Sequence, residues 1–109
     1  MKTEQPILIT SIKALTDIPA NVFVSLSGNI SDGTKLPIGV SNDSAVAGDM
    51  TPVAVNGIVL VKTGATPVTA LSPVTSDANG LATPSADATL TRGIALDDGT
   101  DSLIQVLLR

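Results

Sequence analysis

The alternation of residues 51–62 constrains the fold of this chain more than any other feature. Valines stand at alternate positions on both sides of a central Asn-Gly pair, Val53 and Val55 before it and Val59 and Val61 after it. A period of two is the repeat of a β-strand with one buried face. Asn56-Gly57 is compatible with a two-residue hairpin turn or with a bend inside one long strand. Because the alternation continues through the pair, we prefer the bend.

The kind of hydrophobic residue points the same way. Hydrophobic residues make up 43% of the 109 positions, yet Phe23 is the one aromatic residue, so the core is aliphatic. β-Branched side chains pack well on pleated surfaces and lose rotamer freedom in helices. No window has a sustained 3.6-residue apolar stripe, so we expect any helix to be a single turn, near residues 44–49. A chain of this length forms one domain.

Several further segments are expected to be strands. In residues 21–27, Val22, Val24 and Leu26 should share one face, with Phe23 and the serines on the other. Residues 36–41 form the next expected strand. A tight hairpin should join residues 73–75 to 81–83 through Asp77-Ala78-Asn79-Gly80, and another should join 91–96 to 102–109 through the polar residues 97–101. The terminal strand should be central to the core.

Two blocks of the sequence resemble each other. Residues 36–42, with a following Val-Ala-Val segment, resemble residues 91–97, with a following Ile-Gln-Val segment. Gly93 lies 93 − 39 = 54 positions after Gly39. This pattern suggests two similar β-hairpin units that fold against each other.

These signals predict an all-β domain, a small antiparallel β-sandwich or barrel built from hairpins. Residues 6–13 are rich in β-branched residues but begin with a proline, which is typical of an edge strand or an extended arm. We therefore divide the chain into an extended N-terminal arm, residues 1–20, and a β-rich domain, residues 21–109. The sequence does not distinguish a sandwich from a barrel.

The residue types that most enzymes need are missing. The chain contains no His and no Cys, which removes the usual general base near neutral pH and the usual strong nucleophile. No Ser stands three residues before a Lys, as a Ser-Lys centre would require. Asp97 and Asp98 fit turn chemistry better than an acid–base pair. We predict no catalytic residues, although a small hydrolase with an unorthodox Ser, Asp or Lys centre stays an alternative.

Ligand motifs are equally scarce. The segments around Asp77 and Asp97 have oxygen ligands but lack the glycine and glutamate spacing of a calcium loop, so we predict no metal. No phosphate-binding glycine motif occurs, and we predict no cofactor. A net charge of −4 without a basic cluster argues against nucleic acid. No apolar run approaches eighteen residues, and the N-terminus lacks the pattern of a signal peptide, so we expect neither membrane insertion nor processing.

The order of several features from residue 38 onward resembles the capsid cement, or head-decoration, proteins of tailed bacteriophages. The matching features are Ile38-Gly39-Val40, Ala47-Gly48-Asp49, residues 53–61, residues 73–80, Gly93-Ile94-Ala95-Leu96 and residues 103–109. About two thirds of the chain is covered, and residues before about Asn21 match least well. The resemblance implies a β-rich body without an active site, self-association, and attachment to the major capsid protein.

The expected function is therefore that of a structural protein that decorates the outside of an assembled phage head and stabilises its lattice. Its expected partners are the major capsid protein and itself, as a homotrimer, and it would be made in the host cytoplasm and end on the virion surface. The extended arm could pair with an exposed sheet edge on a neighbour. The residues predicted for this contact are Pro6, Ile7, Leu8, Ile9 and Ile12. Two alternatives stay open: the isoleucines complete the domain's own sheet, or the chain is a carbohydrate-binding or adhesion module.

Overall fold

The computed structural model describes residues 5–33, 36–41, 43–85 and 91–108, and all of its regular elements in these ranges are β-strands. The predicted all-β class is confirmed. The strands are β1 (Gln5–Lys13), β2 (Phe23–Val24), β3 (Gly39–Ser41), β4 (Met50–Lys62), β5 (Pro73–Ser76), β6 (Ala82–Pro84), β7 (Gly93–Ala95) and β8 (Leu103–Leu108).

The strands form one antiparallel sheet that curls into a nearly closed barrel. Its order is β2-β3-β4-β8-β7-β5-β6, and β1 pairs with β4. A parallel bridge between Thr63, just after β4, and Ala82 in β6 brings the far end of the sheet back to β4. The predicted central place of the terminal strand is confirmed, because β8 lies between β4 and β7.

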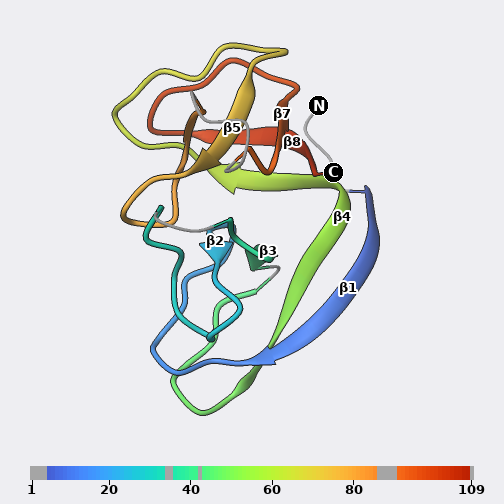
Figure 1. Cartoon of the computed structure of the whole chain (residues 1–109), viewed down its shortest axis with the longest axis vertical. Coiled ribbons are helices and arrows are strands. Elements are labelled where there is room, and N and C mark those ends of the chain that lie inside the picture. Colours follow the sequence, from blue (N-terminus) through green and yellow to red (C-terminus); the bar gives the residue numbers. More distant parts are fainter. Residues whose placement is uncertain (1–4, 34–35, 42, 86–90, 109) are drawn as a thin grey trace.

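Strand β4 runs through the whole molecule and bends at Asn56-Gly57. In Figure 1 its first half rises beside β1, and its second half turns sharply across the molecule below β8. Gly57 has a φ of 101°, which favours glycine, and Asn56 Oδ1 accepts a hydrogen bond from the Gly57 N–H at 2.8 Å. The pairing partner changes there from β3 to β8. The structure therefore confirms the predicted bend, and the alternative of a hairpin turn at Asn56-Gly57 is wrong.

The two predicted hairpins are also confirmed. Strands β5 and β6 pair antiparallel across the Asp77-Ala78-Asn79-Gly80 turn, and β7 pairs with β8. Asp77 Oδ1 accepts hydrogen bonds from the N–H groups of Asn79 and Leu81, which is the side-chain chemistry of an Asx turn.

Other local predictions were too generous. The strand expected at residues 21–27 is limited to Phe23–Val24, and that expected at 36–41 is limited to Gly39–Ser41. The helical turn expected near residues 44–49 is wrong: Ala45 forms a β-bridge with Ile18, and a turn with Gly48 at a φ of 94° follows. Glycine at positive φ and the bridge both stop the backbone from entering a helix.

Strand β2 alternates as predicted, but both of its faces are buried. Phe23 joins the larger apolar cluster, which contains Val59, Val61 and Leu108, whereas Val22 and Val24 join a second cluster with Ile18 and Val53. Leu26, expected beside Val22 and Val24, is 74% exposed, because the chain turns after Val24 and Gly28 N–H bonds back to the Ser25 carbonyl. The strand thus separates two cores.

The chain is built from two copies of one β-unit, which confirms the repeat suggested by the sequence. The first unit comprises residues 5–55 and the second comprises residues 57–108. In each unit, a first strand pairs antiparallel with a last strand, which also pairs with a short strand that contains a glycine. Strand β4 supplies the last strand of the first unit and the first strand of the second. Figure 1 shows the first unit below and the second above.

The correspondence extends to register and hydrogen bonds. Lys13 pairs with Met50 as Lys62 pairs with Leu103, and Thr10 pairs with Val53 as Val59 pairs with Val106. Asn21 and Leu71, which have φ angles of 64° and 68°, occupy the same turn position. Three backbone hydrogen bonds of the first unit have counterparts in the second. Ala14 N–H to Asp49 O corresponds to Thr63 N–H to Ser102 O, and Asn21 N–H to Ser41 O corresponds to Leu71 N–H to Ala95 O. The reciprocal pair Ile18–Ala45 corresponds to Val68–Gly99.

Candidate functional site

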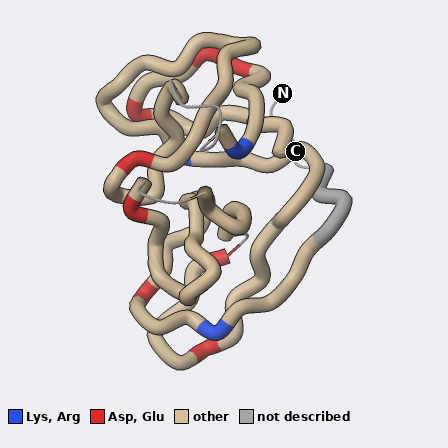
Figure 2. Tube along the Cα trace, viewed as in Figure 1, with Lys and Arg blue, Asp and Glu red and all other residues tan. Residues whose placement is uncertain are grey.

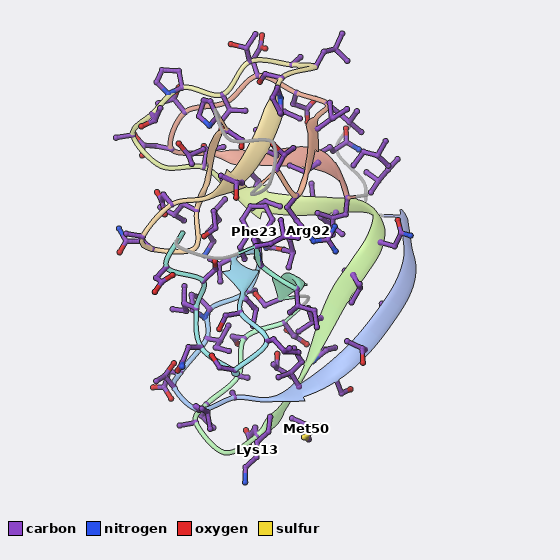
Figure 3. The ribbon with its side chains drawn as sticks, viewed as in Figure 1. Lys13, Phe23, Met50 and Arg92 are labelled. Carbon is purple, nitrogen blue, oxygen red and sulfur yellow. The ribbon has the colours of Figure 1, made fainter. Side chains whose placement is uncertain are left out.

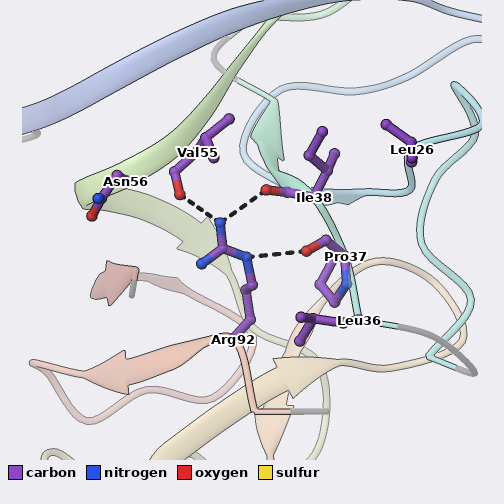
Figure 4. A pocket seen from close by; sticks show the side chains of 7 residues that line it. All are labelled: Leu26, Leu36, Pro37, Ile38, Val55, Asn56 and Arg92. Atoms are coloured by element: carbon purple, nitrogen blue, oxygen red, sulfur yellow. Dashed lines mark hydrogen bonds between the residues drawn. The ribbon is translucent and has the colours of Figure 1, made fainter. Parts of the chain in front are cut away.

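The two units meet at Arg92, a buried cation whose side chain crosses from the second unit into the first. It is 7% exposed, and burial lowers the pKa of its guanidinium from the usual value. Nε donates to the Pro37 carbonyl at 3.0 Å, and Nη2 donates to the Ile38 carbonyl at 2.9 Å and to the Val55 carbonyl. Figure 4 shows the guanidinium among these three backbone oxygens. Charge-assisted hydrogen bonds of this kind offset the cost of burying the cation.

A surface hollow opens beside this clamp. It has a volume of about 460 Å³ and is lined mainly by apolar side chains from the first unit (Figure 4): Leu26, Leu36, Pro37, Ile38 and Val55, with Asn56 and Arg92. Leu26 and Leu36 are 74% and 50% exposed. Because the guanidinium donates to main-chain carbonyls, it holds the wall of the hollow in place, and the leucines are free to contact a partner. The hollow is a candidate protein-binding surface.

The sequence prediction did not include Arg92, Leu26 or Leu36 among the functional residues. The repeat contains a signal that could have identified Arg92 as a functional residue. Arg92 occupies the position in the second unit that Ile38 occupies in the first. Ile38 N–H bonds to the Val24 carbonyl, and Arg92 N–H bonds to the Val74 carbonyl in the same way. A charged residue at a position that is apolar in the sister unit indicates a contact made by that side chain alone.

The predicted arm residues lie in β1, whose backbone pairs with β4 from Gln5 to Lys13 with irregularities around Leu8. The side chains of Pro6, Ile7 and Leu8 lie outside the described part of the structure. Ile9 is 46% exposed, whereas Ile12 packs against the cluster around Ile18 and Val53. This pairing supports the interpretation that residues 5–13 belong to the domain's own sheet. Contact of the arm with another protein stays a prediction.

The aspartates considered for chemistry have structural partners. Asp98 Oδ1 accepts a hydrogen bond from the Ala70 N–H at 2.6 Å, and Asp97 Oδ2 accepts one from the Gln105 N–H at 3.0 Å. Asp97 thereby ties the turn after β7 to β8, and Asp98 ties it to the loop around Ala70, 28 residues away in the sequence. Within the described ranges, no three acidic residues gather in a way that could hold a metal ion.

Two further observations bear on the alternatives. Phe23, the one aromatic residue, is fully buried (Figure 3), so it cannot present the stacking face that sugar-binding sites commonly use. In the part of the chain that the structure describes, no helix is long and apolar enough to cross a membrane.

Comparison with known proteins decides the family. A family model described as phage cement protein matches residues 1–109. The chain belongs to the phage cement protein family. This cement protein therefore has a structural, capsid-associated decoration role and is associated with the virion. The family predicted from the sequence is confirmed, and the match includes the first twenty residues, where the resemblance was weakest.

A solved structure shares the fold of this cement protein. The head fiber gp8.5 N base in bacteriophage phi29 superposes with a TM-score of 0.74 over 94% of this chain and 93% of that chain, at 16% sequence identity. At such low identity the likeness concerns the fold. The comparison with curated proteins finds no match.

Proposed function

We propose that this cement protein binds the outer surface of an assembled phage head and stabilises the lattice of the major capsid protein. The observation that carries the proposal is the family match over residues 1–109. A cement works by spreading many weak contacts over a preformed lattice, so that avidity replaces high affinity at each site. Such a role needs a rigid body with exposed contact residues and no reactive centre, and we propose that the protein is not an enzyme.

The Arg92 hollow is the surface that we assign to the capsid. Leu26 and Leu36 expose large apolar side chains at its edge, and burying them against a protein would release about 1.5–3 kcal/mol each. Arg92 holds the backbone next to Leu36 through the Pro37 and Ile38 carbonyls, and the turn that carries Leu26 is closed by the hydrogen bond from the Gly28 N–H to the Ser25 carbonyl. Little conformational entropy is therefore lost when a partner binds. A preorganised apolar surface of this kind suits docking to a folded subunit.

Strand β1 offers a second contact. In the described structure its pairing partner is β4, which occupies one edge, and the opposite edge could receive a strand from a capsid subunit. Ile9 is the predicted arm residue whose described side chain is well exposed. We propose that Pro6, Ile7, Leu8 and Ile9 contribute to this edge, and that Ile12 supports it from the core side. Self-association as a homotrimer would suit lattice sites of three-fold symmetry.

Co-sedimentation with undecorated heads tests the proposal. The intact protein should sediment with heads that lack it and should raise their melting temperature. The double variant Leu26→Ser/Leu36→Ser should bind at least tenfold more weakly. Leu71→Ser is the matched control, because Leu71 is 79% exposed and does not line the hollow.

Four outcomes would count against parts of the proposal. An intact protein that stays in the supernatant at every concentration contradicts capsid binding. Equal binding of the leucine variant and the control contradicts the role of the hollow. If the Ile9→Ser variant binds heads with full affinity, β1 does not contact the capsid. If sedimentation equilibrium gives the mass of a monomer for the free protein, the protein is not a homotrimer.

A further inference from the structure

The two β-units share few identical residues at equivalent positions, and most of these have a structural reason. Val24 and Val74 are buried, as are Val53 and Val106. Gly28 and Gly80 both have positive φ, and a Cβ on Gly39 or Gly93 would collide with a carbonyl of the neighbouring strand. Ala20 and Ala70 are half-buried in the same turn. Such matches follow from the shared fold.

Thr16 and Thr66 are identical and exposed in equivalent loops, and Lys13 and Lys62 are identical and exposed on equivalent strands. The two lysines occupy the same register position at the end of the first strand of each unit. Among the described residues they are the exposed basic side chains, since Arg92 is buried. Figure 2 shows how sparse Lys and Arg are beside the acidic positions spread over both units. The fold does not require a cation at this position, because an exposed strand end accepts many residue types.

Each lysine lies beside a large exposed apolar residue on the neighbouring strand. Lys13 pairs directly with Met50, which is 62% exposed, and Lys62 pairs directly with Leu103, which is 36% exposed. Directly paired residues of antiparallel strands point to the same face, about 4.5–5.5 Å apart at Cβ. Figure 3 shows Lys13 and Met50 side by side at the lower end of the molecule. We call Lys13–Met50 the first patch and Lys62–Leu103 the second patch.

Strand β4 connects the two patches, because Met50 is its first residue and Lys62 is its last. A straight strand of this length would span about 40 Å, and the bend at Gly57 shortens the span and sets the angle between the patches. A single molecule thus presents one chemical surface twice, at a fixed separation.

We propose that the two patches bind two equivalent sites on neighbouring capsid subunits, each with a carboxylate beside an apolar residue. This inference rests on the proposed function and adds the chemistry of the contact. The chain has a net charge of −4, so an acidic capsid surface is attracted to the lysines more strongly than to the acidic positions spread over both units. Because both patches belong to one rigid sheet, their simultaneous binding links two subunits and gains avidity without additional contact types.

Charge reversal tests the inference in the full chain. Lys13→Glu and Lys62→Glu should each weaken binding to undecorated heads by about 10²-fold or more, since either change removes the avidity of two-site binding. The double variant should lose less than the product of the two single losses. Lys13→Arg and Lys62→Arg should keep the affinity, and melting curves should show that all variants are folded, because both lysines are exposed.

A matched control is available from the same repeat. Thr16 and Thr66 are exposed and occupy equivalent loop positions, and Thr16→Glu/Thr66→Glu changes the net charge by −2, as one Lys→Glu substitution does. This control should bind within about threefold of the intact protein, since it leaves both lysines and both apolar residues of the patches in place. Lysine variants that bind as well as the control, or a loss confined to one lysine, would overturn two-site binding. Failure of the intact protein to bind heads would overturn the proposed function and this inference together.

Discussion

Arg92 Nη2 donates a hydrogen bond of 2.9 Å to the carbonyl of Ile38, the residue that holds the equivalent position in the other unit. Because Arg92 and Ile38 are equivalent residues of the two units, this contact lies where the two units face each other. The guanidinium also binds Pro37 and Val55, so one side chain of the second unit fixes two segments of the first. The junction between the units is thus held by an interaction that only one of them can supply.

Removal of this clamp should destabilise the whole chain. Arg92→Met deletes the charge-assisted bonds and leaves three carbonyls at the junction without their donor, which we expect to cost about 2–4 kcal/mol of unfolding free energy. Urea unfolding measures this loss. Lys62→Met is the control, because Lys62 is exposed and should change stability by less than about 0.5 kcal/mol. A loss below about 1 kcal/mol for Arg92→Met would show that the junction holds without the clamp.

Substitution of the glycines of β3 and β7 by alanine should lower the stability of the protein by similar amounts. A Cβ on Gly39 would lie 2.2 Å from the Ala54 carbonyl oxygen, and a Cβ on Gly93 would lie 2.5 Å from that of Leu107. We expect Gly39→Ala and Gly93→Ala to cost about 2–3 kcal/mol each, because a backbone oxygen in a paired strand cannot move away easily. Gly48→Ala has free space and meets only the strain of a φ of 94°, about 1–2 kcal/mol. Thermal unfolding of the three variants should show this order, and a reversed order would contradict the close approach of the strands.

Thr51 offers a stabilising substitution. Its hydroxyl is buried and has no hydrogen-bond partner among the described residues, and the equivalent position in the second unit is the fully buried Ile104. Thr51→Val keeps the shape and removes the unpaired polar atom, so we expect a gain of about 1 kcal/mol. The midpoint of urea unfolding should rise. A fall in the midpoint would mean that the hydroxyl is satisfied in solution.

Substitution of the two isoleucines of β1 should show which of them packs in the core and which lies at the surface. Ile12→Ala should lower the unfolding free energy by about 1–3 kcal/mol, because Ile12 packs against the cluster around Ile18 and Val53. Ile9→Ala should lower it by less, about 1 kcal/mol, since Ile9 is 46% exposed. Differential scanning calorimetry compares the two. Equal losses would show that β1 is oriented differently on β4.

Deletion of residues 1–13 is a stronger test of the same strand. Without β1, the first half of β4 loses its antiparallel neighbour, and the core cluster that includes Ile12 is opened. We expect the deletion to remove most of the stability, which for a domain of this size is about 5–15 kcal/mol. Circular dichroism should show lost β-structure. An unchanged unfolding midpoint would instead identify β1 as a detachable arm.

The sequence alone determined the all-β class, the long bent strand and two hairpins. Val53 to Val61 alternate with a period of two, and Asp77 to Gly80 carry turn chemistry, so these elements depend on neighbours in the chain. The family resemblance and the repeat centred on Gly39 and Gly93 were also readable. The signals for the strands and turns are local, because strand periodicity and turn conformation are set within a few residues.

The tertiary structure decided what the local pattern could not. Burial of Phe23 on one face of β2 and of Val24 on the other depends on two separate cores that meet at this strand. The role of Arg92 depends on carbonyls up to 55 residues away in the sequence. The placement of β1 depends on its pairing with β4. Long-range pairing and packing determine which side chains remain exposed, and exposure determines which of them can bind another protein.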